Sequence, residues 1–227
     1  MSGAITAGSI YGGTGNDSLT LGAITANTSV LGEDGADTFS IVSALTSSVI
    51  GGSGNDSLVI GGSAFKSFID AGDDADFITV GGSFTSATLS GGSGNDTISL
   101  AAVHGKSTIN AGAGDDSLVI ASGISGSTLN ASGGNDLISI SGGITSDSLM
   151  GGAGNDSFTG TLGTGTQTVT ATGGNNTIIT GTDIDIINVG TGQDTVTVNG
   201  GIANTINFTL STHLVANSVT VTDWTAA

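Results

Sequence analysis

The sequence predicts an all-β protein, a parallel β-solenoid (β-roll) of about ten coils, each of about 20 residues with two short strands. Three observations favour this fold. A glycine–aspartate motif returns about every 20 residues, apolar residues alternate with polar ones on both sides of it, and glycine supplies 41 of the 227 residues. So much glycine disfavours helix. A fixed period of this length is typical of stacked repeats, which bury their apolar sides against one another.

The repeat is a nine-residue motif with glycine at positions one, two and four and aspartate at position six. Full copies begin at Gly12, Gly51, Gly91 and Gly151. Weaker copies begin at Gly32, Ala71, Ala111, Ala131, Ala171 and Val189. Successive copies start 18 to 20 residues apart, which sets the length of one coil.

Each coil is predicted to contain one strand after the motif and a second strand before the next motif. The first strand carries apolar residues two positions apart, at Leu19, Phe39, Leu58, Ile78, Ile98, Leu118, Ile138, Phe158, Ile178 and Val196, and again at Leu21, Ile41, Ile60, Val80, Leu100, Ile120, Ile140 and Val198. The second strand is marked by Val30, Val49, Ile69, Leu89, Ile109, Leu129, Leu149, Val169 and Ile187. Because side chains alternate along a strand, one face of each points inward. A bend of small residues, such as 61–64, joins the two strands.

The motif has the composition of a calcium-binding loop. Nine of the ten loops carry the carboxylate, at Asp17, Asp37, Asp56, Asp76, Asp96, Asp116, Asp136, Asp156 and Asp194, and Asn176 replaces it in the ninth coil. Stacked coils would place these groups about 5 Å apart, where each pair repels by roughly 1 kcal/mol in water and about 3 kcal/mol at an effective dielectric constant of 20. Calcium binds six to eight carboxylate and carbonyl oxygens, and glycine lets a turn direct its carbonyls to one point. Aspartate also favours plain turns, but nine copies at one position favour a metal.

The charge balance excludes several partners. The net charge is −17, and 14 of the 19 acidic residues lie in the motif loops, including Glu33, Asp34, Asp73, Asp74 and Asp115. Lys66 and Lys106 are the only basic residues besides two histidines, too few to bind nucleic acid or an anionic membrane. No apolar run approaches the 18 residues of a spanning helix, so membrane insertion is not expected. No classical N-terminal signal peptide is recognisable.

These loops resemble those of the repeats-in-toxin (RTX) family, and the resemblance covers about residues 12–198. It implies a parallel β-roll with calcium between the loops of adjacent turns, bound by the nine aspartates. It also implies carbonyl ligands from the glycine loops, around Gly13, Gly15, Gly52, Gly54, Gly92, Gly94, Gly112, Gly114, Gly152 and Gly154. The family further implies type I export through an uncleaved C-terminal signal, and hence an extracellular or cell-surface protein.

This chain departs from the family pattern in one respect. RTX rolls usually have two motifs back to back in each 18-residue turn, with metal on both edges. Here the second half-turn has about eleven residues and no aspartate motif. We therefore expect calcium along one edge only.

The predicted organisation has three parts. Residues 1–11 form an N-terminal cap or first strand, and residues 12–198 form the RTX-like β-roll. Residues 199–227, which include Trp224, form a β-rich cap, a contact segment or a secretion signal. The β-prone tail and the uncharged first residues predict self-association through the ends of the solenoid or through the tail.

No catalytic constellation is recognisable, and we expect no enzymatic activity. His104 is aligned with Phe84, Ile124 and Ile144 near the second bend, where it is expected to be a surface or half-buried filler. The favoured function is a calcium-rigidified structural or interaction protein outside the cell, such as a surface-layer, adhesin or fibre component. The alternatives are a virion appendage or capsid decoration protein, and a folding or secretion module of an RTX exoenzyme.

Overall fold

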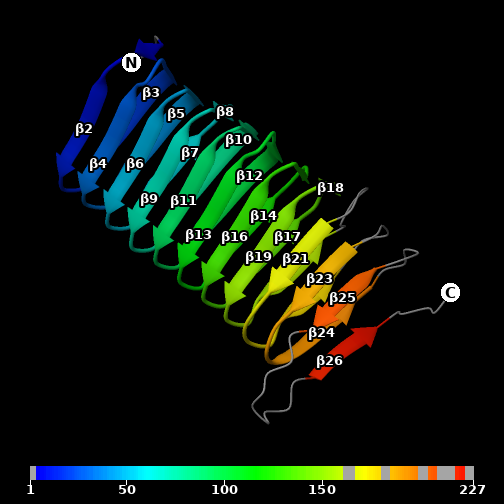
Figure 1. The fold of residues 1–227 in the computed structure, drawn as a ribbon. Helices are drawn as coiled ribbons and strands as arrows, with labels where there is room; N and C mark the ends of the chain where they lie inside the picture. Colours follow the sequence, from blue (N-terminus) through cyan, green and yellow to red (C-terminus); the bar gives the residue numbers. More distant parts are fainter. Residues whose placement is uncertain (1–3, 161–166, 180–184, 199–203, 209–217, 223–227) are drawn as a thin grey trace.

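The computed structural model describes residues 4–160, 167–179, 185–198, 204–208 and 218–222. It confirms the predicted fold: the chain is all-β and forms a parallel β-solenoid with coils of about 20 residues. Figure 1 shows the strands stacked in register from the blue N-terminal end to the red C-terminal end. The described residues contain no helix, and therefore none long and apolar enough to cross a membrane.

The strands form two facing parallel sheets. Sheet 1 contains β1 (Ile5–Thr6), β3 (Ser18–Thr25), β5 (Thr38–Leu45), β7 (Ser57–Ile60), β10 (Phe77–Thr85), β12 (Thr97–His104), β14 (Ser117–Ile120), β17 (Leu137–Ile140), β20 (Ser157–Gly160), β22 (Thr177–Ile179), β24 (Gln193–Thr197) and β26 (Ser218–Thr222), with the short β8 (Ala64–Phe65), β15 (Ile124–Ser125) and β18 (Ile144–Thr145) beside it. Sheet 2 contains β2 (Ser9–Thr14), β4 (Ser29–Asp34), β6 (Ser48–Ser53), β9 (Phe68–Asp73), β11 (Thr88–Ser93), β13 (Thr108–Ala113), β16 (Thr128–Gly133), β19 (Ser148–Ala153), β21 (Gln167–Ala171), β23 (Asp185–Val189) and β25 (Thr205–Phe208). The chain therefore alternates between the two sheets, and each coil contributes to both of them.

Two edges connect the sheets. The glycine–aspartate edge, where the chain passes from sheet 2 to sheet 1, contains the repeat motifs. The hydroxyl edge, where the chain returns from sheet 1 to sheet 2, contains the second bends around residues 26–28, 46–47, 66–67, 86–87, 106–107, 126–127 and 146–147. Strands pair beyond the predicted 12–198 roll at both ends, because β1 pairs with β3 and β26 pairs with β24.

The core lies between the sheets and consists of side chains stacked at equivalent positions. The predicted inward columns of both strands are confirmed: Ile78, Ile98, Leu118 and Ile138, for example, are register partners and are buried. A third inward column was not predicted. It lies at the hydroxyl edge and contains Ile24, Ala44, Ala64, Phe84, Val103, Ile124 and Ile144, all at most 1% exposed.

This third column corrects the alignment of His104. Val103, not His104, is the register partner of Phe84 and Ile124. His104 pairs instead with Thr85 and Ser125, and its side chain is exposed. The coil that contains it reaches the bend one residue earlier, which the motif spacing does not reveal.

The hydroxyl edge holds non-glycine residues in the left-handed region. Ala26, with φ of 52°, is one of them, and its side chain is exposed. A left-handed backbone costs an L-residue roughly 1–2 kcal/mol. Other coils place glycine at this edge, for example Gly126 with φ of 62°.

Ala26→Gly is therefore expected to stabilise the protein by up to about 1 kcal/mol, since the relief of strain exceeds the added entropy of the unfolded chain. Thermal unfolding in calcium measures this. Ala75→Gly is the matched control, because Ala75 is exposed but is not a left-handed residue. It should destabilise the protein by about 0.5–1 kcal/mol. A loss of stability in Ala26→Gly would contradict the prediction.

Candidate metal centre

The predicted aspartates lie at equivalent positions along the glycine–aspartate edge, and their side chains point into the interior of the loops. Eight of the nine are at most 3% exposed, and only Asp17 in the first loop is partly exposed. Asn176, which replaces aspartate in the ninth coil, is equally buried. The sequence predicted the row of carboxylates but not their burial, and burial makes an isolated negative charge far more costly.

From Asp37 onward, one oxygen of each carboxylate bridges two coils. The Oδ1 atom accepts a hydrogen bond from the main-chain N–H of the equivalent residue one coil earlier. In the middle of the row, Asp56 N–H donates to Asp76 Oδ1 over 2.7 Å, and Asp76 N–H donates to Asp96 Oδ1 over 2.8 Å. Equivalent bonds join the other described loops from Asp17 to Asp194 over 2.7–3.1 Å. The row is therefore a continuous ladder along the stack.

The other oxygen has no hydrogen-bond partner among the described residues. This holds for the buried Oδ2 atoms of Asp17, Asp37, Asp56, Asp76, Asp96, Asp116, Asp136, Asp156 and Asp194. A buried carboxylate oxygen without a partner is costly, and one such atom in each of nine loops is too regular to be a packing defect. Each of these oxygens requires a proton or a cation.

Main-chain carbonyls converge on the same places. A Cβ atom added to Gly91 would clash with both Asp96 Oδ2 and the carbonyl oxygen of Ala111, one coil further on. A Cβ atom on Gly51 would likewise clash with Asp56 Oδ2 and the carbonyl oxygen of Ala71. In these two loops, glycine at the first motif position therefore leaves room for oxygens from two successive coils to approach each other.

The carbonyls predicted at motif positions two and four point along the stack. A Cβ atom on Gly92, whose φ is 117°, would clash with the carbonyl oxygen of Gly72, and one on Gly94 with that of Asp74. The same relation holds for the described loops that contain Gly52, Gly54, Gly112, Gly114, Gly152 and Gly154. Gly13 and Gly15 lie in the first loop and have no earlier loop to meet. Carboxylate and carbonyl oxygens between two coils are the donors that calcium prefers.

These oxygens fit calcium better than a softer metal. No group of three or more His, Cys, Asp or Glu side chains gathers in the part of the chain that the structure describes. The ligands at this edge are carboxylate and carbonyl oxygens, which calcium prefers, whereas zinc prefers the sulfur of Cys and the nitrogen of His. We therefore propose that the nine aspartates and the glycine-loop carbonyls would hold calcium, which would neutralise the buried charge.

The pKa values of the buried aspartates agree with a calcium site at this edge. Burial, opposed in part by the N–H bond from the preceding coil, raises the pKa of Asp56, Asp96 and Asp136 to about 6. For Asp76 and Asp116 burial together with the neighbouring carboxylates raises the pKa to about 7. Burial also raises the pKa of Asp156. Without a cation, the folded protein holds these carboxylates only at a cost.

A second ladder lies on the outer side of the same loops and was not predicted. Asn95 Oδ1 accepts a hydrogen bond from the N–H of Asp115 over 2.9 Å, and Asn135 Oδ1 accepts one from the N–H of Asn155 over 2.9 Å. Here the side chain binds the coil that follows it, whereas each inner aspartate binds the coil that precedes it. The asparagine before the aspartate in the motif was the available signal. The two side chains of an Asn-Asp pair thus accept hydrogen bonds from both neighbouring coils, the aspartate from the preceding coil and the asparagine from the following one.

The hydroxyl edge carries a comparable buried ladder without carboxylates over most of its length. It contains Thr28, Ser47, Ser67, Ser107 and Ser127, all at most 5% exposed. Ser107 Oγ accepts a hydrogen bond from Ala87 N–H and donates one to the carbonyl oxygen of His104. Because a hydroxyl both accepts and donates, this ladder is satisfied by the protein alone.

Towards the C-terminal end, Asp147, Gln167 and Asp185 replace the hydroxyl in that column, and all three are buried. Asp147 accepts hydrogen bonds from Ser127 N–H at Oδ1 over 2.7 Å and from Thr145 N–H at Oδ2 over 2.8 Å. Both of its oxygens therefore have partners, unlike those of the motif aspartates. The expectation of calcium along one edge only is untested and stays a prediction, and the difference between the two ladders supports it for the coils up to Asp147.

Comparisons with known proteins agree with this geometry. A family profile described as the RTX calcium-binding nonapeptide repeat, in four copies, matches residues 5–23, 85–102, 105–126, 122–158, 141–164 and 170–202. These segments together span more than half of the chain. No curated protein matches the sequence.

A similar solved structure is the crystal structure of a hyperactive, Ca2+-dependent, β-helical antifreeze protein from an Antarctic bacterium. The TM-score is 0.70 and the sequence identity 26%, over 92% of this chain. The match covers 65% of that protein's chain. This chain thus shares a fold with a β-helix that depends on calcium.

Proposed function

Because this chain belongs to the family of RTX calcium-binding nonapeptide repeat proteins, we propose that it is a non-enzymatic, extracellular structural or interaction protein. Calcium along the glycine–aspartate edge would fold and stiffen its rod. The observation that carries this proposal is the row of buried Oδ2 atoms without partners. Outside the cell millimolar calcium is available, and extracellular calcium modules bind in the range of about 10⁻⁴–10⁻³ M.

The rod has the form of a spacer or adhesive element. Each coil contacts its neighbours alone, so that the length of such a protein can grow by repeats without changing its core. Sheet 1 ends at β1 and β26, and sheet 2 ends at β2 and β25 within the described residues. Strand edges at such ends favour addition of another strand, which supports self-association through the ends. Trp224 lies outside the described residues.

The decisive experiment is a calcium titration of the metal-free chain at neutral pH, followed by circular dichroism. We expect a cooperative gain of β signal that a chelator reverses, because the buried carboxylates are neutralised only when calcium binds. Magnesium should give no such gain, since it demands stricter octahedral geometry and dehydrates reluctantly. A chain that stays fully folded after exhaustive chelation would overturn the proposal.

Ice binding is a second candidate function, and the outer face of sheet 1 favours it. Two outward columns on this face consist largely of hydroxyl residues in register, as in the pairs Thr97 with Ser117 and Thr79 with Ser99. A rigid array with the regular interstrand spacing of about 4.8 Å could order water. Phe77, Leu137 and Val119 interrupt it, so we expect weak thermal hysteresis at most. Thermal hysteresis in calcium, with a chelated control, tests this candidate.

A further inference from the structure

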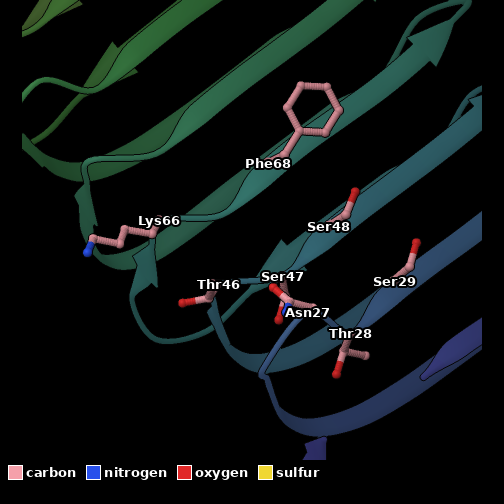
Figure 2. A pocket seen from close by; sticks show the side chains of 8 residues that line it. All are labelled: Asn27, Thr28, Ser29, Thr46, Ser47, Ser48, Lys66 and Phe68. Atoms are coloured by element: carbon pink, nitrogen blue, oxygen red, sulfur yellow. The ribbon is translucent and has the colours of Figure 1, made fainter. Parts of the chain in front are cut away.

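A groove on the hydroxyl edge lies across three successive coils, away from the calcium-binding edge. Its volume is about 280 Å³, just below the range of typical small-molecule sites. Figure 2 shows the side chains that line it: Asn27, Thr28, Ser29, Thr46, Ser47, Ser48, Lys66 and Phe68. The groove is therefore sized for one small ring and is lined mostly by polar groups.

Four of these polar side chains have unused hydrogen-bonding capacity. The hydroxyls of Ser29, Thr46 and Ser48 and the amide of Asn27 are at least partly exposed. The structure gives no hydrogen bond to any of the four side chains among the described residues, whereas the buried hydroxyls of Thr28 and Ser47 bond to main-chain carbonyls. The floor of the groove is thus satisfied, and its rim presents free donors and acceptors.

The backbone at the rim is strained where these side chains project. Asn27, Thr46 and Lys66 have φ of 64°, 52° and 49°. A β-branched residue such as Thr46 is an outlier in this region. The same conformation recurs at this bend in other coils, as at Ser86 with φ of 51°, so it sets the direction of these side chains but does not by itself mark a ligand site.

An exposed aromatic ring closes one end of the groove. Phe68 is 41% exposed and occupies an outward column of sheet 2 in which its register partners are Ser48 and Thr88. The fold does not need an aromatic residue here, since its neighbours carry hydroxyls. Figure 2 shows the ring on strand β9, above the row of hydroxyls.

The ligand that fits these groups is uncharged. The side chain of Lys66 extends away from Phe68 in Figure 2, and its Nζ lies 5.2 Å from the centre of the Phe65 ring. Lys66 lines the groove, but a cation–π contact draws its ammonium group towards Phe65. The chain as a whole carries a net charge of −17, which disfavours acidic ligands.

We propose that this groove binds one neutral pyranose unit of a carbohydrate. The apolar face of the sugar ring would lie on Phe68, and its hydroxyl groups would bond to Asn27, Thr46 and Ser48. Sugars combine an apolar ring face with a rim of hydroxyls, and the groove offers the complementary pair. The site goes beyond the proposed structural function, because it lies on the other edge and requires no calcium ligand.

The test is saturation-transfer NMR on the full chain in saturating calcium. The probes are neutral oligosaccharides of glucose, galactose, mannose and N-acetylglucosamine, with a glucuronate oligosaccharide as the charged comparison. At least one neutral probe should bind, and Phe68→Ser should weaken it at least tenfold. Thr46→Val, which removes one hydroxyl at nearly constant shape, should weaken it about threefold or more.

Phe77→Ser is the matched control. Phe77 is 44% exposed, lies on sheet 1 and pairs with Ser57 and Thr97, so that serine suits its column as well. This variant should bind within about twofold of the wild type. Circular dichroism in calcium should be unchanged in all three variants, which separates a failure of this site from a failure of the calcium-dependent fold.

Three outcomes would overturn the proposal. The first is the absence of binding by every neutral probe in calcium-folded protein. The second is binding that survives Phe68→Ser, or that falls equally in Phe77→Ser. The third is tighter binding of the glucuronate probe than of any neutral sugar, which would assign the groove to an acidic ligand.

Discussion

Asp96→Asn is expected to destabilise the protein in calcium and to stabilise it in chelator. In calcium the variant loses one anionic ligand within the row, and by analogy with breaking a buried charge pair we expect a loss of about 3–5 kcal/mol. In chelator the same change removes a buried, unpartnered oxygen and its charge, which should gain about 1–3 kcal/mol. The sign of the effect therefore depends on the metal.

The protein itself shows that asparagine fits this position. Asn176 Oδ1 accepts the N–H of Asp156 over 2.9 Å, as an aspartate would. Its Nδ2 donates to the carbonyl oxygen of Gly173 over 3.1 Å and to Asp194 Oδ1 over 2.8 Å. Asp96→Asn can therefore keep the bond from Asp76 and satisfy its second side-chain atom without metal.

The measurement is urea or thermal unfolding in saturating calcium and, separately, in chelator with an osmolyte that keeps the protein folded. Two variants serve as controls. Asp96→Ala also leaves the N–H of Asp76 without its acceptor, so it should destabilise in both conditions. Asp147→Asn lies on the hydroxyl edge and loses one of two accepted bonds, so it too should destabilise in both. An effect of equal sign for Asp96→Asn in the two conditions would refute the metal assignment.

The solenoid and its inward columns could be predicted because the same pattern of apolar residues recurs in each coil. A single apolar position such as Leu118 is ambiguous, but its recurrence at Ile98 and Ile138 fixes both the strand and the inward face. The carboxylate row followed from the same periodicity. The family assignment rested on the full motif copies, and the match to the RTX repeat profile confirms it.

Other features depend on how coils are set against each other, which a repeat does not specify. The buried orientation of Asp96 follows from the hydrogen bond donated by a residue 20 positions away. The third core column was hidden because Val103 lies one residue earlier in its coil than its register partners. The groove at Phe68 needs three adjacent bends in left-handed conformations, and no motif marks those.

The calcium-free protein is expected to become more stable as the pH falls from about 7 towards 4. Burial raises the pKa of Asp76 and Asp116 to about 7 and that of Asp56, Asp96 and Asp136 to about 6, from 3.8 in the unfolded chain. In this window the folded protein binds protons that the unfolded chain has released, so protonation favours folding. The stabilising contribution is complete below pH 3.8 and is lost as the pH rises through 6–7.

The effect should be large, because a pKa that rises from 3.8 to about 6 costs the folded state roughly 3 kcal/mol per carboxyl at neutral pH. Thermal unfolding of metal-stripped protein between pH 4 and 8 measures it. A variant with both Asp76→Asn and Asp116→Asn should show a flatter profile, since it lacks the two carboxyls with the highest pKa. Stability that rises with pH in the metal-free wild type would contradict the prediction.

Calcium should reverse this dependence. A carboxylate that binds calcium must be deprotonated, so protons compete with the metal and stability in calcium should fall as the pH drops below about 6. The two profiles, with and without calcium, are therefore expected to converge at low pH. Protons and calcium satisfy the same buried Oδ2 atoms, so either of them can neutralise the row of buried carboxylates. Only calcium can also bind the carbonyls of the next coil, and so only calcium should stiffen the rod.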